Sequence, residues 1–186
     1  LPDGTLFLLI ARGGIEGRGY IDGGVYVSRD GASSWKNVPL PVGVNAPNDL
    51  VVDPQEPKRM YLCCWPWPSE GVEKHGGVLR TEDGGVTWER VFDEDAHVYA
   101  AAVDPSNPAV VFINTFDSAA FRSEDYGASW NRLGGYNFKW GHRPVVDPHQ
   151  PDKLFLTTFG GSVFYGPAKG DPGAFEDIVE REVLRW

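Results

Sequence analysis

One pattern of residue types occurs three times in the chain. It reads S-R-D-G-A-S-S-W at 28–35, R-T-E-D-G-G-V-T-W at 80–88 and S-E-D-Y-G-A-S-W at 123–130. Each copy follows an apolar run. It combines an Asp that can hydrogen-bond its own turn, a Gly that tolerates a positive φ, and a Trp that opens the next run. This order of residue types predicts a β-hairpin, so the three copies predict a repeated antiparallel unit.

A second pattern keeps step with the first. L-V-V-D-P-Q-E-P begins at Leu50, A-A-V-D-P-S-N-P at Ala101 and P-V-V-D-P-H-Q-P at Pro144. Each copy predicts a short strand that ends at Asp-Pro, a tight turn and another strand. The two patterns alternate along the chain, which indicates one unit of four strands and roughly 40 to 50 residues. The Asp residues of the Asp-Pro turns are Asp53, Asp104 and Asp147.

The first pattern resembles the Asp-box (BNR) repeat of sialidases, sortilin-type receptors and xyloglucan-cleaving glycoside hydrolases. The resemblance implies an all-β fold, the β-propeller, in which each box joins the two outer strands of a four-stranded blade. It also implies that the box residues hold the turn and carry no chemistry. These structural residues are Asp30, Gly31, Trp35, Asp83, Gly84, Trp88, Asp125, Gly127 and Trp130.

The strand order predicts about three and a half blades over residues 1–170, followed by a tail or closing strand at 171–186. The first unit begins without an inner strand at Leu6, and no box follows the last predicted strand, which ends at Tyr165. A propeller needs several more blades to close and to hide its inner strand edges. We therefore expect part of a seven-bladed propeller, or a ring completed by another chain or by copies of this one.

Composition limits the partners. The net charge of −9 disfavours contacts with nucleic-acid phosphates and with anionic membrane surfaces, so we expect neither partner. The two cysteines are neighbours, Cys63 and Cys64, and adjacent strand residues point to opposite faces, so no disulfide framework is expected. We expect a secreted or periplasmic protein.

The longer connections are predicted at the end of the blades opposite the boxes, and long loops on a rigid scaffold are where ligand contacts concentrate. They contain W-P-W-P with Trp65 and Trp67, and Y-N-F-K-W with Tyr136 and Trp140. Exposed aromatic rings suit the apolar faces of sugars, which predicts a polysaccharide or oligosaccharide partner. The alternative is that the rings fill blade interfaces. The predicted substrate-binding residues are Trp65, Trp67, Tyr136, Trp140, His142 and Arg143.

Glycoside hydrolysis requires two carboxyl groups, roughly 5 to 10 Å apart. Asp117 is a candidate because its loop is short, and Asp95 is a candidate because His97 follows it closely; the three residues form the predicted catalytic set. In the xyloglucan-cleaving enzymes that the chain resembles, the two catalytic aspartates come from different halves of the propeller. The resemblance therefore implies that this chain holds one of the pair at most.

Three functions remain open at this point. The leading hypothesis is the carbohydrate-recognising half of a glycoside-hydrolase-like propeller. The first alternative is a non-catalytic protein-interaction or assembly module. The second is a polysaccharide lyase that uses His142 with a tyrosine. The histidines lack close H-x-H or H-x-x-x-H spacing, so we expect neither a metal nor another cofactor.

Overall fold

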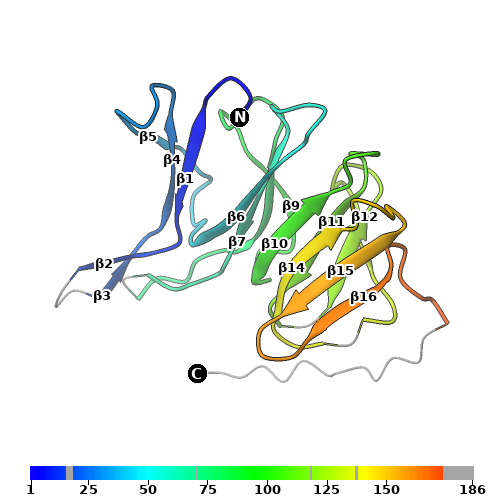
Figure 1. The fold of residues 1–186 in the computed structure, drawn as a ribbon. Helices are drawn as coiled ribbons and strands as arrows, with labels where there is room; N and C mark the ends of the chain where they lie inside the picture. The colour runs from blue at the N-terminus through cyan, green and yellow to red at the C-terminus, as the bar shows by residue number, and fades with distance from the viewer. Residues whose placement is uncertain (16–18, 70, 118, 137, 174–186) are drawn as a thin grey trace. The chain divides into compact units, whose positions relative to one another are not determined.

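The computed structural model describes residues 1–15, 19–69, 71–117, 119–136 and 138–173. Every regular element in these ranges is a β-strand (Figure 1). The chain divides into two compact units, Leu1–Val98 and Tyr99–Trp186, and each is described by itself below. Residues 174–186 of the predicted tail lie outside the described residues.

The first unit contains a three-stranded sheet of order β1-β4-β5, a four-stranded sheet of order β6-β7-β8-β9, and a small hairpin, β2-β3. We call the two larger sheets the first and second sheets. Their strands and the hairpin are β1 (Leu6–Ile10), β2 (Gly13–Ile15), β3 (Gly19–Ile21), β4 (Gly24–Ser28), β5 (Lys36–Val38), β6 (Pro47–Val52), β7 (Met60–Cys64), β8 (Gly77–Thr81) and β9 (Glu89–Phe92).

The second unit contains the third sheet, of order β10-β11-β12-β13, and the fourth sheet, of order β14-β15-β16. The strands pair antiparallel with their sequence neighbours, so each sheet is a meander. The strands are β10 (Val98–Val103), β11 (Val111–Thr115), β12 (Ala120–Ser123), β13 (Asn131–Arg132), β14 (Gly141–Val146), β15 (Lys153–Thr158) and β16 (Val163–Pro167).

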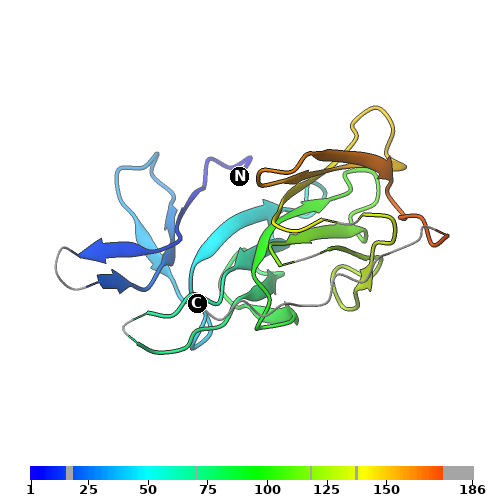
Figure 2. The same ribbon diagram turned by 90° about the horizontal axis from the view of Figure 1, so that it is seen from below.

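This strand order confirms the predicted all-β architecture of about three and a half four-stranded blades. The second and third sheets have all four strands, whereas the first sheet has no inner strand and the fourth has no outer strand among the described residues. The β2-β3 hairpin was not predicted. It continues β1 and β4 beyond the first sheet, and Gly13 pairs with Ile21 across it (Figures 1 and 2). Its glycines have low strand propensity, which is why the sequence reads as a loop there.

Among the described residues, an apolar cluster lies between the two sheets of each unit. In the first unit, Val25 of β4 and Leu62 of β7 are fully buried in the same cluster. In the second, Phe112 of β11 lies in a cluster with Leu154 and Leu156 of β15. Burial of a side chain of this size contributes roughly 1.5–3 kcal/mol. Leu154 and Leu156 of β15 are buried, whereas Phe155 between them is only half-buried, because successive residues of a strand point to opposite faces of the sheet.

The connections β4–β5, β8–β9 and β12–β13 share one set of hydrogen bonds, and we call them the Asp turns. In the third of them, the Asp125 carboxylate accepts the Ser123 hydroxyl at 2.7 Å, and the Ser129 N–H and hydroxyl at 2.8 and 2.6 Å. The Ser123 hydroxyl oxygen in turn accepts the Gly127 N–H at 2.8 Å. The same bonds surround Asp30 and Asp83.

These hydrogen bonds stabilise the charged carboxylates. The hydroxyl of the Ser or Thr four residues later is the largest cause, followed by the N–H of the same residue. Together they lower the pKa of Asp30 and of Asp125 to about 2, and they lower the pKa of Asp83 as well. These carboxylates therefore accept the hydrogen bonds that hold their turns.

The two residues after each of these aspartates have positive φ. The pairs are Gly31 and Ala32, Gly84 and Gly85, and Tyr126 and Gly127. The second residue of each pair donates its N–H to the hydroxyl that opens the turn. Gly85 therefore belongs to the turn as much as Gly84 does, although only Gly84 was predicted as a structural residue.

The Asp-Pro turns are held in a similar way. The Asp53 carboxylate accepts the N–H groups of Gln55 and Glu56 at 2.8 and 3.1 Å, and Asp104 and Asp147 repeat the arrangement. In the second and third sheets, which contain both kinds of turn, the strand order places the Asp turn and the Asp-Pro turn at the same end. We call it the turn end, and we call the opposite end, which carries the longer connections, the loop end.

Candidate functional site

The inner strands β6, β10 and β14 each place a polar or aromatic residue at the loop end. These residues are Asn48, Tyr99 and His142, and each lies five positions before the Asp of an Asp-Pro turn. This spacing makes the three positions equivalent in the sequence. Of the three residues, His142 was predicted as a site residue, whereas Tyr99 and Asn48 were not. Loop-end positions on inner strands are therefore the repeated signal for candidate site residues.

A β-bulge sets the side chains at the start of β14. Gly141 pairs with Thr158 and Pro144 with Leu156, so His142 and Arg143 lie opposite the single residue Thr157. The Thr157 hydroxyl lies 3.1 Å from His142 Nδ1 and accepts the Arg143 N–H at 2.9 Å. Bulges occur often beside binding sites because they redirect a side chain. Here the bulge fixes the His142 ring and leaves Arg143 exposed.

Aromatic rings surround His142 at the loop end of the second unit. The His142 ring centroid lies 5.0 Å from that of Tyr99 and 4.7 Å from that of Phe159. Phe159 also contacts Tyr99 at 4.8 Å and Phe116 at 6.0 Å in edge-on arrangements. Phe116 and Phe159 were not predicted as site residues. They directly follow β11 and β15, the second strands of their sheets, and so also lie at the loop end, although not on the inner strands.

Trp140 lies beside this cluster and is bound to it through its backbone. Its N–H donates to the Phe116 carbonyl at 2.7 Å, and its carbonyl accepts the Phe159 N–H at 2.8 Å. The indole is 51% exposed, and the residue has φ of 61°. A left-handed conformation costs a non-glycine residue roughly 1–2 kcal/mol. The fold therefore holds a large apolar side chain in an unfavourable backbone conformation and presents it to solvent.

Asp117 follows Phe116 directly and is exposed. The Phe116–Trp140 backbone bond consequently places this predicted acid at the same loop end as the aromatic cluster. We define the loop-end site as Tyr99, Phe116, Asp117, Trp140, His142, Arg143 and Phe159. The structure brings together four of the predicted site residues here: Asp117, Trp140, His142 and Arg143.

Tyr136 has a different environment. It is 4% exposed, belongs to the apolar cluster of the second unit, and donates its hydroxyl to the Pro167 carbonyl at 2.8 Å. Burial raises the pKa of its phenol to about 12. The alternative that the sequence left open, a ring that fills the interior, describes Tyr136 in this structure.

The loop end of the first unit contains the other predicted rings. Trp65 is stacked on His97, with centroids 3.7 Å apart and planes 10° apart, and it meets Trp67 edge-on at 4.4 Å. The Arg12 guanidinium lies 4.3 Å from the centre of the Trp67 ring. Both Trp residues are half-buried, so protein groups already cover much of these rings.

His97 and Asp95 lie in contrasting surroundings. His97 is 3% exposed, and burial lowers its pKa to about 3, so the imidazole is neutral at physiological pH. Its Nε2 lies 3.4 Å from the Asn48 amide nitrogen. Asp95 is exposed and donates its backbone N–H to the Asp93 carboxylate at 2.9 Å. His97 is thus suited to packing and hydrogen bonding rather than to donating protons at neutral pH.

Within the described residues, no three side chains of His, Cys, Asp or Glu come together in a way that would hold a metal ion. His75 Nδ1 lies 3.6 Å from the Glu94 carboxylate, and Cys63 and Cys64 are both buried without forming a disulfide. Burial raises the pKa of the Cys64 thiol to about 12, which makes it unreactive. The part of the chain that is described also contains no helix able to span a membrane.

No known family model matches this sequence. Curated relatives are nevertheless found. A xyloglucanase of Paenibacillus sp is 26% identical over 131 residues, which is 61% of this chain. Xyloglucanase Xgh74A of Acetivibrio thermocellus is 25% identical over 97 residues, or 47% of this chain. An oligoxyloglucan-reducing end-specific xyloglucanase of Emericella nidulans is 32% identical over 96 residues, or 46%. The chain spans only 11–13% of the length of these relatives.

Solved structures agree with the fold. The GH74 xyloglucanase of Xanthomonas campestris superimposes with a TM-score of 0.65 at 19% identity, over 87% of this chain and 25% of that enzyme. YCF48 of Cyanidioschyzon merolae gives 0.52 at 23% identity, over 74% and 38%. YCF48 bound to D1 peptide gives 0.51 at 14% identity, over 70% and 39%. At these identities the likeness concerns the fold, and the chain has the fold of part of a β-propeller that resembles a xyloglucanase.

Proposed function

We propose that the chain is the carbohydrate-recognising part of a glycoside-hydrolase-like propeller and that it binds a polysaccharide at the loop-end site of its second unit. The names of the curated relatives support this ligand class, because they are xyloglucanases. The second support comes from this chain itself and is the exposure of Trp140.

The main support for the proposal is the exposure of the Trp140 side chain together with the positive φ of this residue. Neither burial nor backbone preference accounts for an indole that is 51% exposed at a φ of 61°. A flat apolar ring beside hydrogen-bonding groups is the arrangement that suits a sugar, whose apolar face stacks while its hydroxyls bond. Phe159, 38% exposed, extends the apolar surface, and Arg143 and His142 supply the polar groups.

In this proposal the other predicted site residues are assigned to catalysis, to secondary stacking or to no contact with the ligand. Asp117 is the candidate acid, and a partner carboxylate from elsewhere in a completed propeller would form the pair that hydrolysis requires. Trp65 and Trp67 are secondary stacking positions, because their rings are partly covered. Asp95 and His97 remain weaker catalytic candidates in the first unit, and the buried Tyr136 is left out.

The proposal also includes the wider organisation. We take the three Asp turns to be Asp-box turns of the BNR type, since their hydrogen bonds and positive φ values repeat at the predicted positions. Further blades, from another chain or from copies of this one, would complete the ring. A secreted or periplasmic location follows from the proposed polysaccharide ligand.

The test is binding and cleavage across a panel of polysaccharides that includes xyloglucan. Affinity electrophoresis is expected to show retardation by at least one neutral glycan, with about tenfold weaker binding in Trp140→Ala, because a stacking contact contributes roughly 1.4 kcal/mol. The matched control is Trp35→Ala, which removes an indole of 38% exposure from the turn end. Asp117→Asn is expected to keep binding and to lose any release of reducing ends. An absence of retardation across the panel would contradict the proposal.

A protein-interaction or assembly module is the second candidate. It is favoured by apolar side chains on the face of the fourth sheet that points away from its core: Val145 is 42% exposed, Tyr165 47% and Val163 61%. YCF48, one of the proteins with a similar fold, has been solved with a bound peptide. This candidate predicts a protein partner that Tyr165→Ser weakens, with no binding of any glycan.

A polysaccharide lyase is favoured by one contact, between His142 and Tyr99, whose ring centroids are 5.0 Å apart. A base and an acid at this separation suit β-elimination from an acidic sugar. The expected signature is an unsaturated product that absorbs in the ultraviolet and that disappears with His142→Ala. An acidic polymer that remains intact would reject the lyase.

A further inference from the structure

The hydroxyl group of Thr157 in β15 contacts both residues of the β14 bulge in the loop-end site. Its oxygen lies 3.1 Å from His142 Nδ1 and accepts the Arg143 N–H at 2.9 Å. The hydroxyl also donates to the Arg143 carbonyl at 3.2 Å. A threonine hydroxyl has one hydrogen to donate and two lone pairs that can accept. Its single hydrogen is therefore engaged by Arg143.

These contacts decide which nitrogen of the His142 ring carries hydrogen. Because the Thr157 hydroxyl gives its hydrogen to the Arg143 carbonyl, His142 Nδ1 can bond to the same oxygen only by donating. In a neutral imidazole one nitrogen donates and the other accepts, and the bond made by one nitrogen sets the state of the other. The Nδ1–H form of His142 thus satisfies every group at Thr157, and it leaves the lone pair on Nε2.

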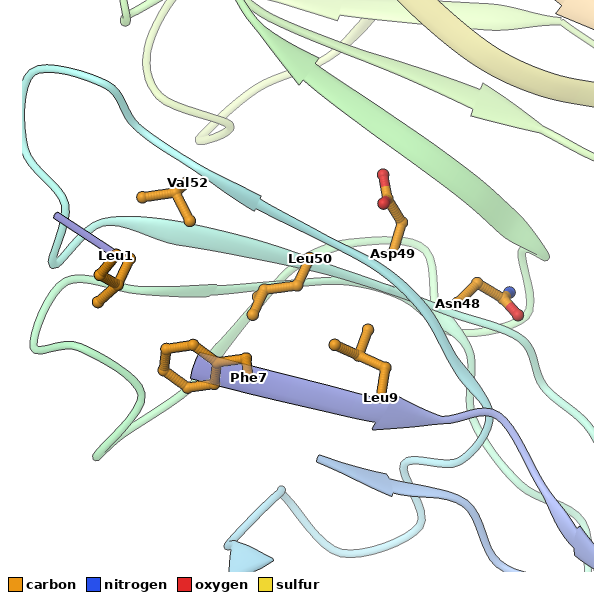
Figure 3. Close-up of a pocket in the computed structure, with 7 residues that line it drawn as sticks. All are labelled: Leu1, Phe7, Leu9, Asn48, Asp49, Leu50 and Val52. Atoms are coloured by element: carbon orange, nitrogen blue, oxygen red, sulfur yellow. The ribbon is translucent and has the colours of Figure 1, made fainter. Parts of the chain in front are cut away.

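The hydroxyl group is not needed to form the bulge. β6 has the same irregularity, in which Asn48 is the extra residue (Figure 3). Asn48 and His142 hold equivalent positions, and Cys63 stands where β15 has Thr157, ten residues after the Asp of an Asp-Pro turn. A bulge therefore forms at this position without a hydroxyl. What the Thr157 hydroxyl adds is its contact with the His142 ring.

A buried amide holds Thr157 from the neighbouring sheet. Asn114 of β11 is fully buried, and its Nδ2 donates to the Thr157 carbonyl at 3.3 Å. Thr157 also pairs with Val163 of β16. The backbone that carries the hydroxyl is therefore held from two sides, as a residue that orients another side chain requires.

We infer that Thr157 is a positioning residue of the loop-end site, and that His142 Nε2 accepts a hydrogen bond from a hydroxyl group of the bound sugar. This inference rests on the proposed binding of a polysaccharide and names the ligand group that this part of the site recognises. Nε2 lies on the side of the ring away from Nδ1, and His142 is half-buried, so part of the residue is open to solvent. A sugar hydroxyl can donate to Nε2, whereas a carboxylate or an ether oxygen has no hydrogen to donate.

The tautomer is measured by nuclear magnetic resonance of the ring nitrogens in the full chain without ligand. The solution is kept at about pH 8.5, because a protonated ring carries hydrogen on both nitrogens. The spectrum of His142→Ala identifies the signals of this ring among those of the four histidines. The Nδ1–H form is expected to predominate. Thr157→Val, which keeps the branched shape, is expected to lower the ratio of Nδ1–H to Nε2–H about fivefold, which corresponds to about 1 kcal/mol.

The ligand group is tested by adding xyloglucan oligosaccharides to the same sample. At saturation the Nε2 signal of His142 is expected to move toward that of a hydrogen-bonded nitrogen, while the Nδ1 signal stays in place. Thr157→Val is expected to weaken glycan binding about fivefold, and Thr157→Ser, which restores the hydroxyl, is expected to bind within about twofold of the wild type. Melting curves show whether each variant is folded.

Thr158→Val is the matched control on the neighbouring residue. The Thr158 hydroxyl also bonds to both backbone groups of one residue, because it accepts the Ser162 N–H at 3.0 Å and donates to the Ser162 carbonyl at 3.0 Å. Loss of this hydroxyl removes a comparable pair of bonds without touching those of the bulge. The tautomer ratio of His142 and the affinity for glycan are therefore expected to stay unchanged.

Four results would overturn the inference. They are a wild-type His142 in the Nε2–H form, a tautomer ratio and affinity that Thr157→Val leaves unchanged, a failure of Thr157→Ser to restore them, and an Nε2 signal that does not move at saturation. A wild-type chain that binds no glycan would instead reject the proposed function, and the sugar hydroxyl with it. The ring signals of the free chain would still decide whether Thr157 sets the tautomer of His142.

Discussion

The imidazole of His97 lies flat against the indole of Trp65, with 3.7 Å between ring centroids. Burial keeps the imidazole neutral and lowers its pKa from 6.5 to about 3. Below pH 6.5 the unfolded chain binds a proton at this residue that the folded chain does not bind, so stability falls as the pH is lowered from 6.5 toward 3. The loss from this group is about 2 kcal/mol at pH 5.

Denaturant unfolding at a series of pH values checks this prediction, with His97→Phe as the control. The variant keeps an aromatic ring against Trp65 and has no titrating group. Its stability is expected to change by about 2 kcal/mol less than that of the wild type between pH 7 and pH 5. Parallel curves for the two proteins would contradict the assignment.

In the Asp turns, two substitutions are expected to change stability in opposite directions. Ala32 has φ of 69°, where Gly85 and Gly127 stand in the other two turns. Ala32→Gly is expected to stabilise the protein by about 0.5–1 kcal/mol, since glycine adopts this conformation without strain. Gly85→Ala is expected to destabilise it by about 1 kcal/mol, because a Cβ at Gly85 meets no atom closer than 3.5 Å and only the backbone conformation resists it. Thermal unfolding shows whether each variant is more or less stable than the wild type. A stability change in the same direction for both variants would contradict this explanation from backbone conformation.

A substitution of Trp140 is expected to weaken glycan binding without a large change in the free energy of unfolding. Trp140→Gly relieves a left-handed tryptophan and removes a ring that is 51% exposed, so the two effects offset each other. Its free energy of unfolding is expected to lie within about 1 kcal/mol of the wild type. Its glycan binding is expected to weaken about tenfold, as in Trp140→Ala. A strongly destabilised variant would show that the indole is held for packing and not for a ligand.

A substitution of Tyr136 is expected to lower stability without changing glycan binding. Tyr136→Phe removes the hydroxyl that donates to the Pro167 carbonyl at 2.8 Å and leaves that carbonyl without this bond. The expected cost is about 1 kcal/mol of stability with glycan binding unchanged. Calorimetric melting together with affinity electrophoresis separates the two quantities. A loss of binding without a loss of stability would return Tyr136 to the list of ligand contacts.

Much of the fold follows from local chemistry that the sequence displays. The turns at Asp30, Asp83 and Asp125 are held by residues within six positions of one another, and so their geometry is readable from a short pattern. The strand order follows because the second, third and fourth sheets are meanders of sequence neighbours, and only the β2-β3 hairpin interrupts this order in the first sheet. The β2-β3 hairpin was missed, since its pairing is made by backbone groups and leaves little mark in glycine-rich sequence.

The candidate site was less accessible from sequence. Tyr136 and Trp140 lie in one aromatic run, yet Tyr136 is 4% exposed and Trp140 51%. Which of two such rings points inward depends on packing across strands that are distant in sequence. The contacts of His142 with Tyr99 and Phe159 likewise join three separate segments. The five-residue spacing before each Asp-Pro turn would have identified Tyr99 and Asn48, whereas no spacing rule identifies the bulge opposite Thr157.

The most direct test of the central claim is a nuclear magnetic resonance titration of the full chain with xyloglucan oligosaccharides. If the loop-end site binds a glycan, the indole N–H of Trp140 and the amides of Phe116, Trp140 and Phe159 are expected to shift together and saturate. The indole signal of Trp35, at the turn end, is expected to stay in place. Shifts confined to the turn end, or no shifts at any concentration, would contradict the claim that the loop-end site binds a glycan.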